Sequence, residues 1–283
     1  MTTKTKLVKR QSSVLLPERD IDKSPVLECV GLGVTFGGLK AVEDFNLTIG
    51  RTEIAGLIGP NGAGKTTVFN LLTNVYQPTR GSILIDGMPT AGKKTYQVNR
   101  MGVARTFQNI RLFKELSVID NIKVGLHESM KYNLASSLLR MPNYWKEEKQ
   151  CTERALELLD IFHMADLANA QAGSLPYGAQ RRLEIMRALA TGPKLLLLDE
   201  ATSGLDPVVR DEVTDLLLDF ARDENHSILI SSHIVSDLEK LCDTIAFLHK
   251  GRLLLCEEKD ALREEYALWH GTAAQLAALD AQV

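Results

Sequence analysis

The sequence predicts an α/β fold with a largely parallel central sheet, and three observations support this prediction. Short apolar runs typical of strands recur along the chain, at 26–30, 53–58, 82–85, 195–200, 227–233 and 244–249. Helical periodicity lies between several of these runs, since apolar residues fall three or four positions apart. One such face holds Val209, Val213, Leu216, Leu217 and Phe220, and another holds Val235, Leu238, Leu241 and Cys242. The runs LLLL and SILI lack polar alternation, as expected for strands buried on both faces of a parallel sheet.

The elements follow in chain order from the N-terminus. Residues 1–24 are polar and of mixed charge, and we expect them to form a disordered tail. We expect one large domain over 25–264, which begins with the predicted strand VLECV. The stretch 109–190 is mostly helical in pattern with few β-branched runs, so it predicts a helical subdomain inserted into the α/β core. The last segment, 265–283, has helical character and predicts a C-terminal helical extension.

Composition excludes some classes of function. The 283 residues carry a net charge of −3 and a sequence pI of about 6.1, which disfavours nucleic acid as a partner. No apolar run approaches the roughly 18–20 residues of a membrane-spanning helix, so any membrane role requires a partner. The four cysteines show no metal-binding spacing, and reduced thiols are expected.

A glycine-rich segment follows the second predicted strand. GPNGAGKT, from Gly59 to Thr66, matches the phosphate-binding P-loop and leads into a helical run. Its backbone N–H groups and the helix N-terminus favour phosphate oxygens. Lys65 supplies charge to the β- and γ-phosphates, and the Thr66 hydroxyl suits Mg²⁺. The predicted ATP-binding residues of this segment are Gly59, Pro60, Asn61, Gly62, Ala63, Gly64, Lys65, Thr66 and Thr67. The alternative is a flexible turn with an ordinary surface lysine.

The run LLLLDE ends a predicted buried strand in two adjacent carboxylates. Such a pair is costly to bury unless a cation or a reaction requires it. Asp199 suits the Mg²⁺ shell, and Glu200 is placed to polarise a water for attack on the γ-phosphate. The alternative is a strand cap that hydrogen-bonds nearby loops.

Six motifs together resemble the ATP-binding subunits of ABC transporters. They are the P-loop, ARTFQN, SLPYGAQRRLEIMRALA, LLLLDE, SGLD and SSH, and they occur in that order over roughly 26–260. The resemblance implies a RecA-like P-loop core with an antiparallel β-subdomain and an inserted α-helical subdomain. It also implies that two subunits, as a homodimer or with a paralogue, sandwich two ATP molecules head to tail.

The same resemblance implies roles for residues outside the P-loop. Phe36 matches the aromatic residue that stacks on adenine, although a core position in the β-subdomain is the alternative. Gln108 matches the glutamine that contacts Mg²⁺ and the attacking water, and His233 the switch histidine that bonds the γ-phosphate. Gly178 and Asp206 match residues that face the partner subunit. Pro176 replaces the usual signature serine and has neither hydroxyl nor N–H, so contact in trans must come from the Gly178 backbone and the following helix.

Two parts of the chain resemble two different branches of the ABC transporter family. The PYG signature, GVARTFQNIRLF, RRLEI and the insertion at 127–150 resemble the importers of branched-chain amino acids. The C-terminal third, from about 200–206 onward, resembles the ATPases of ABC-2-type exporters. Both imply transmembrane permease partners and a cytoplasmic location on the inner face of the cell membrane. An alternative function of another class is that of a soluble ABC ATPase without a membrane partner. Another is that of a nucleotide-binding module with little turnover, which Pro176 and Ala201 would favour.

Overall fold

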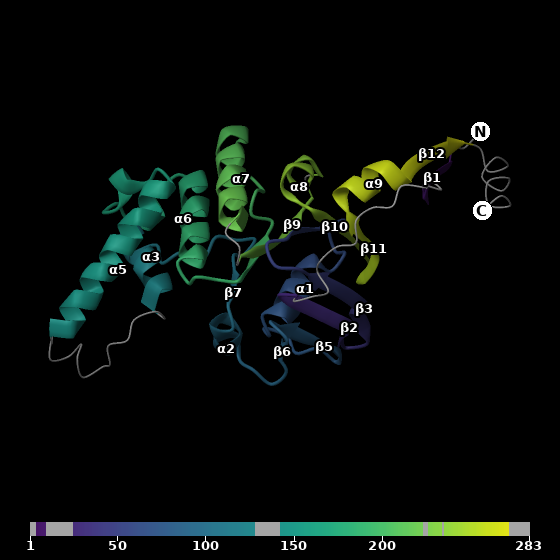
Figure 1. Ribbon diagram of the computed structural model, residues 1–283, viewed down its shortest axis with the longest axis horizontal. Helices are drawn as coiled ribbons and strands as arrows, with labels where there is room; N and C mark the ends of the chain where they lie inside the picture. The colour runs from purple at the N-terminus through teal and green to yellow at the C-terminus, as the bar shows by residue number, and fades with distance from the viewer. Residues whose placement is uncertain (1–3, 10–24, 128–141, 223–225, 234, 272–283) are drawn as a thin grey trace. The chain divides into compact units, whose positions relative to one another are not determined.

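The computed structural model describes residues 4–9, 25–127, 142–222, 226–233 and 235–271 (Figure 1). The chain forms two compact units. The larger unit ends at Cys256 and contains nearly all of the helices and strands, and the smaller contains both ends of the chain. No helix among the described residues combines the length and the apolar character needed to cross a membrane.

The larger unit is built on a six-stranded sheet, which confirms the α/β prediction. Its strand order is β11 (Arg252–Glu258), β10 (Thr244–His249), β4 (Ile54–Ile58), β9 (Ser227–Ser232), β8 (Leu195–Asp199) and β7 (Val103–Arg105). The strands from β10 to β7 pair in parallel. Every residue of β8 and β9 is buried, as the apolar runs LLLL and ILI within them predict. Because parallel strands share one carboxyl edge, the segments after β4, β7, β8 and β9 meet there.

A second sheet is antiparallel, as expected for a β-subdomain. Its order is β3 (Leu39–Ile49), β2 (Leu27–Phe36), β5 (Arg80–Ile85) and β6 (Met88–Pro89). Helix α1 (Lys65–Leu72) lies between the two sheets, since Phe69 shares one buried cluster with Phe45 of β3 and Leu229 of β9. The core therefore fixes α1, and with it the loop that precedes α1.

The expected helical insertion is present in the described residues. Helices α3 (Val118–Leu126), α5 (Pro142–Ile161) and α6 (Tyr177–Leu189) form one group in Figure 1, while 128–141 lie outside the described residues. Two short 3₁₀ turns, Ala165–Leu167 and Ala172–Ser174, join α5 to α6. The Ser117 hydroxyl caps α3 by accepting the Asp120 N–H at 3.1 Å.

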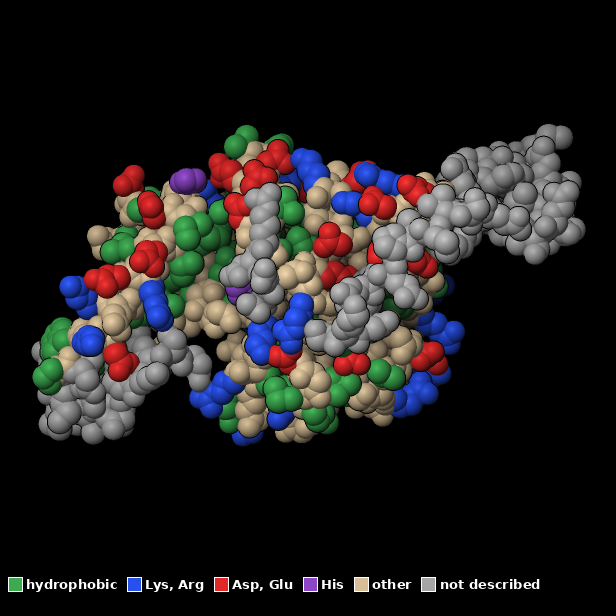
Figure 2. All heavy atoms as spheres, in the orientation of Figure 1, with side chains coloured by type: hydrophobic (Ala, Val, Ile, Leu, Met, Phe, Trp, Pro, Cys, Tyr) green, Lys and Arg blue, Asp and Glu red, His purple; other side chains and the backbone are tan. Residues whose placement is uncertain are grey.

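Three further helices belong to the larger unit. Helices α7 (Pro207–Arg222) and α8 (Val235–Leu241) connect strands of the parallel sheet, while α2 (Thr95–Arg100) joins β6 of the antiparallel sheet to β7. In α8 the predicted face is buried at Leu238, Leu241 and the following Cys242, but Val235 is 61% exposed. Acidic and basic side chains are interspersed over the face in Figure 2.

The two ends of the chain differ from the sequence-based expectation. Strand β1 (Lys4–Lys9) pairs antiparallel with β12 (Tyr266–Gly271), beside α9 (Lys259–Glu265). The expectation of a disordered tail is therefore wrong for Lys4–Lys9, and the expectation of a helical extension is wrong for Tyr266–Gly271. The rest of these two segments, 10–24 and 272–283, lies outside the described residues. The pairing joins segments more than 250 residues apart in sequence, so local periodicity carries no sign of it.

Candidate functional site

A pocket of about 290 Å³ lies at the carboxyl edge of the parallel sheet. The loop between β4 and α1 forms one wall, and Gln108 and Glu200 form the other. The residues of the loop and of α1 that line it are Asn61, Gly62, Ala63, Gly64, Lys65, Thr66 and Thr67. The fold thus brings together seven of the nine predicted P-loop residues with two residues predicted from distant motifs.

The glycine-rich loop has the backbone that a phosphate cradle requires. Gly62 and Gly64 have φ values of 79° and 107°, a region that favours glycine. A Cβ at Gly59 would lie 2.3 Å from the Leu248 carbonyl oxygen, so no larger residue fits there. Helix α1 begins at Lys65, and its free N–H groups point the positive end of the helix at the pocket.

Lys65 supplies the positive charge of this cradle. Its Nζ donates to the carbonyl oxygens of Gly59 at 2.7 Å and Pro60 at 3.4 Å. The ammonium group therefore lies over the loop, although the side chain is largely buried. A buried, localised cation above a ring of backbone donors is suited to a polyphosphate.

Glu200 is the acidic group of the pocket. Its Oε2 accepts the Gln108 Nε2–H at 2.9 Å, and its Oε1 lies 3.9 Å from both Lys65 Nζ and His233 Nδ1. The backbone φ of Glu200 is +50°, which is unusual for a residue with a side chain. Such a conformation persists only where neighbours hold it, and it turns the carboxylate toward the pocket.

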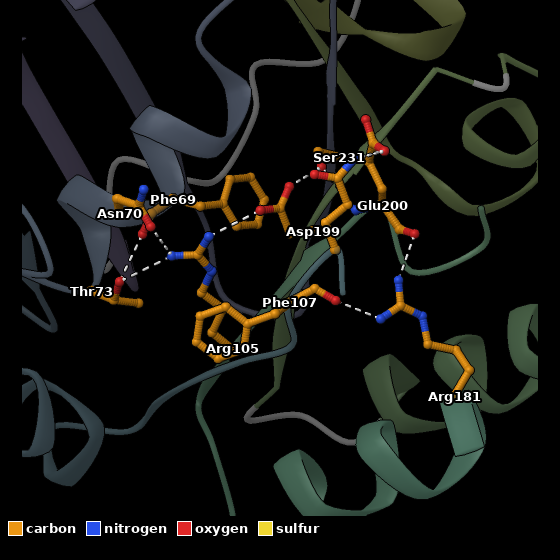
Figure 3. A network of polar contacts seen from close by, with 10 residues as sticks. Phe69, Asn70, Thr73, Arg105, Phe107, Arg181, Asp199, Glu200 and Ser231 are labelled. Carbon is orange, nitrogen blue, oxygen red and sulfur yellow. Dashed lines mark hydrogen bonds and ion pairs between the residues drawn. The ribbon is translucent and has the colours of Figure 1, made fainter. Parts of the chain in front are cut away.

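Arg181 of α6 holds the backbone of Glu200 (Figure 3). The guanidinium is fully buried, and its Nη2 donates to the Glu200 carbonyl oxygen at 2.8 Å. Its Nε donates to the Ala201 carbonyl at 3.0 Å and its Nη1 to the Phe107 carbonyl at 2.6 Å. Glu184 balances the charge at 2.7 Å. One side chain of the helical group thus joins the segments that carry Gln108 and Glu200.

Asp199 lies beneath Glu200 at the end of β8 and is 1% exposed. Its Oδ1 accepts the Ser231 Oγ–H at 3.0 Å, and its Oδ2 accepts the Arg105 Nη2–H at 3.0 Å (Figure 3). Burial lowers the pKa of the Arg105 guanidinium, and the Asp199 carboxylate acts against that shift. Ser231 also accepts the Glu200 N–H at 3.0 Å, so the two acidic residues share one support.

Comparison with known proteins identifies the family of this chain. A family model described as ABC transporter matches residues 42–203. The chain belongs to the ABC transporter family. It is 39% identical over 240 residues to the high-affinity branched-chain amino acid transport ATP-binding protein BraF of Pseudomonas aeruginosa, covering 85% of this chain and 94% of BraF. It is 42% identical over 227 residues to the corresponding protein LivG of Escherichia coli K12, covering 80% and 89%.

More distant members of the ABC transporter family share the fold. The lipopolysaccharide export system ATP-binding protein LptB of Escherichia coli K12 is 33% identical over 230 residues, covering 81% of this chain and 88% of LptB. A solved dimeric bacterial ABC transporter cassette, MJ0796, superposes with a TM-score of 0.71 at 23% identity, covering 82% and 98%. An alignment of 240 residues in a chain of 283 extends past Asp206 wherever it starts, so the likeness to BraF includes part of the C-terminal third.

Five of the predicted residues outside the P-loop do not line the pocket, and they are Phe36, Gly178, Asp199, Asp206 and His233. Phe36 is 43% exposed and packs edge-on against Tyr76, with ring centroids 5.1 Å apart. Gly178 lies at the start of α6 against Val209, and Asp206 caps α7 by accepting the Val208 and Val209 N–H groups at 3.1 Å. Asp206 therefore has a structural role within this chain, which the motif alone did not indicate.

The donor set suits a hard divalent cation. Asp199, Thr66 and Gln108 offer carboxylate, hydroxyl and amide oxygens, which Mg²⁺ prefers. Among the described residues, His, Cys, Asp and Glu form no cluster of three that could hold a metal by itself. A cation that completes its shell with phosphate oxygens and water fits such a sparse site.

Proposed function

We propose that this chain binds ATP with Mg²⁺ in the pocket and hydrolyses it to energise the import of branched-chain amino acids. The observation that carries the proposal is the placement of Glu200 between Gln108 and Lys65 in the pocket that the P-loop lines. The cargo is proposed from the likeness to BraF and LivG, at 39% and 42% identity.

The residues divide the chemistry between them. When bound, ATP supplies the γ-phosphoryl group and Mg²⁺ neutralises charge on the phosphates. The α1 N-terminus and Lys65 bind the phosphates, while Thr66, Asp199 and Gln108 hold the cation. Glu200 orients the attacking water and accepts its proton, and His233 donates to the γ-phosphate. Phe36 offers a flat apolar ring to adenine.

Closure of two cassettes over the nucleotide completes the proposed site. Gly178 and Asp206 lie outside the pocket of their own chain, in agreement with a role toward the pocket of a partner, either a second copy or a paralogue. Pro176 precedes α6 and offers no donor, so the Gly178 N–H and the helix end would contact the γ-phosphate. ATP that binds the closed dimer preferentially would drive closing, and hydrolysis would reopen it.

A groove of about 600 Å³ is the proposed docking site for a helix of a transmembrane permease subunit. It lies between β7 and the helical group and is lined by Phe107, Arg111, Phe113, Val124 and Arg187, among others. Arg111 lies 4.2 Å from the centroid of the Phe107 ring, and Arg187 lies 5.5 Å from that of Phe113. The groove is apolar and basic, since the Glu184 carboxylate is already bonded to Arg181 and the Arg111 N–H. An amphipathic helix with an acidic residue fits this surface, which would place the chain on the inner face of the cell membrane.

Cell fractionation and uptake of labelled leucine test the proposal together. In cells lacking the chain, we expect leucine uptake to fall and to return with the wild-type gene but not with a Glu200→Gln variant. Sedimentation of the chain with membranes, without any effect on uptake, would favour export, the function for which LptB is named. Recovery of the chain in the supernatant would favour a soluble ABC ATPase.

A further inference from the structure

Arg105 is a buried charged residue beside Asp199, and the proposed chemistry gives it no role. It is the last residue of β7, three positions before Gln108, and its side chain is 5% exposed. Its Nη2 contacts Asp199 Oδ2 at 3.0 Å, and its Nη1 donates to Asn70 Oδ1 at 2.7 Å and Thr73 Oγ1 at 3.4 Å (Figure 3). The guanidinium thus spans from the carboxyl end of β8 to the helix that starts in the P-loop.

The surroundings of Arg105 restrict how it can move. Its Cζ lies 5.6 Å from the centroid of the Phe69 ring and 4.9 Å from that of the Phe107 ring. Its Nε–H has no acceptor among the described residues, so the two terminal nitrogens make its hydrogen bonds. A planar guanidinium held by two aromatic rings and by fixed acceptors has one orientation, which a lysine ammonium would not share.

Stability is a weak explanation for this pair. A buried ion pair often contributes no more than an apolar pair of similar volume, because both charges lose their hydration. Here the arginine bonds one oxygen of Asp199 and Ser231 bonds the other, which leaves each oxygen a lone pair. The two donors therefore fix the orientation of the Asp199 carboxylate and leave each of its oxygens able to accept one more partner.

We propose that Arg105 is a positioning residue for the Mg²⁺ site, which orients Asp199 and ties it to α1. This inference rests on the proposed ATP–Mg²⁺ function. Residues that hold a metal ligand in place commonly affect metal affinity nearly as strongly as the ligand does. Arg105 joins Asp199 to the helix that carries Thr66, so these two of the three proposed ligands keep a fixed spacing.

The test compares binding of the non-hydrolysable fluorescent analogue MANT-AMPPNP in EDTA and in excess Mg²⁺. The Kd in EDTA divided by the Kd in Mg²⁺ measures how far Mg²⁺ strengthens binding of the analogue, independently of turnover. In Arg105→Met we expect this ratio to fall by about 10-fold or more while Kd in EDTA stays within about twofold, matching Asp199→Asn. Arg105→Lys should recover part of the ratio, because it restores the charge without the bridge to Asn70.

Two further variants keep the result interpretable. Asn70→Ala removes the α1 anchor but leaves the ion pair, and it should lower the ratio by about threefold even if Arg105→Met fails to fold. Arg252→Met, at an exposed arginine paired with Glu43, serves as the control and should leave the ratio unchanged. A ratio unchanged in Asn70→Ala and in a folded Arg105 variant, while Asp199→Asn loses it, would overturn the inference. Absence of MANT-AMPPNP binding by the wild type would instead overturn the proposed function.

Discussion

Replacement of Arg181 by methionine tests how strongly this buried arginine, which bonds the backbone of Glu200, stabilises the fold. The arginine is 0% exposed and gives hydrogen bonds to Phe107, Glu200, Ala201 and Glu184. Its loss leaves the buried Glu184 carboxylate without the arginine that bonds it at 2.7 Å, and breaking a buried pair in this way costs about 3–5 kcal/mol. At about 2–4 °C per kcal/mol for a domain of this size, Tm should fall by about 6–20 °C.

A double variant separates the charge from the shape of the side chain. Arg181→Met with Glu184→Gln removes the uncompensated charge and keeps the acceptor for the Arg111 N–H, so it should recover about 1–3 kcal/mol relative to Arg181→Met alone. Arg182→Met, in a partly exposed pair with Glu212, is the matched control and should change stability by less than about 1 kcal/mol. Differential scanning calorimetry measures all four proteins. A double variant no more stable than Arg181→Met would refute the reasoning.

Nucleotide affinity, membrane association and thiol reactivity each provide a further test. Phe36→Ala should weaken ATP binding by about 10-fold while Phe36→Tyr retains it, since stacking on a base contributes about 1–3 kcal/mol. Equal affinity of the wild type and Phe36→Ala in a fluorescent-nucleotide titration would leave Phe36 only its packing against Tyr76. Phe113→Asp should release the chain from membranes without changing nucleotide affinity, because Phe113 is 50% exposed in the proposed docking groove; retention in the membrane pellet would argue against that groove. DTNB should modify the partly exposed Cys256 before Cys29, because burial raises the pKa of the Cys29 thiol, and mass spectrometry of the labelled peptides would expose the reverse order.

The sequence predicted the parts of the fold that are local. The P-loop, the strand that ends at Asp199 and the strand before His233 each carry their signal within a few residues, because apolar runs and glycine positions depend on nearby backbone. Strand β7 has only three residues, Val103–Arg105, and is too short for periodicity to reveal. The pairing of β1 with β12 depends on residues from opposite ends of the chain, which no local pattern reports.

The residues of the site likewise fall into those that local motifs predicted and those that only the structure revealed. Lys65, Thr66, Gln108 and Glu200 were predicted from motifs, and they line one pocket. Arg105 and Arg181 stand within the motifs ARTFQN and RRLEI, but a lone arginine in a sequence is more often exposed. Only their burial against carboxylates and backbone carbonyls identifies them as supports of the site. The one signal in the sequence that could have indicated them is their position within these two motifs.

ATP turnover by the purified chain and by Glu200→Gln, with size-exclusion chromatography of both in ATP and Mg²⁺, tests the central claim most directly. The substitution removes the proton acceptor but keeps the shape of the side chain and leaves the P-loop intact. We expect the wild type to hydrolyse ATP. In the variant we expect the turnover rate to be lower by at least about 100-fold, while the protein elutes as an ATP-bound dimer. Equal turnover by the two proteins, or a variant that neither binds ATP nor dimerises while the wild type does, would contradict the role assigned to Glu200.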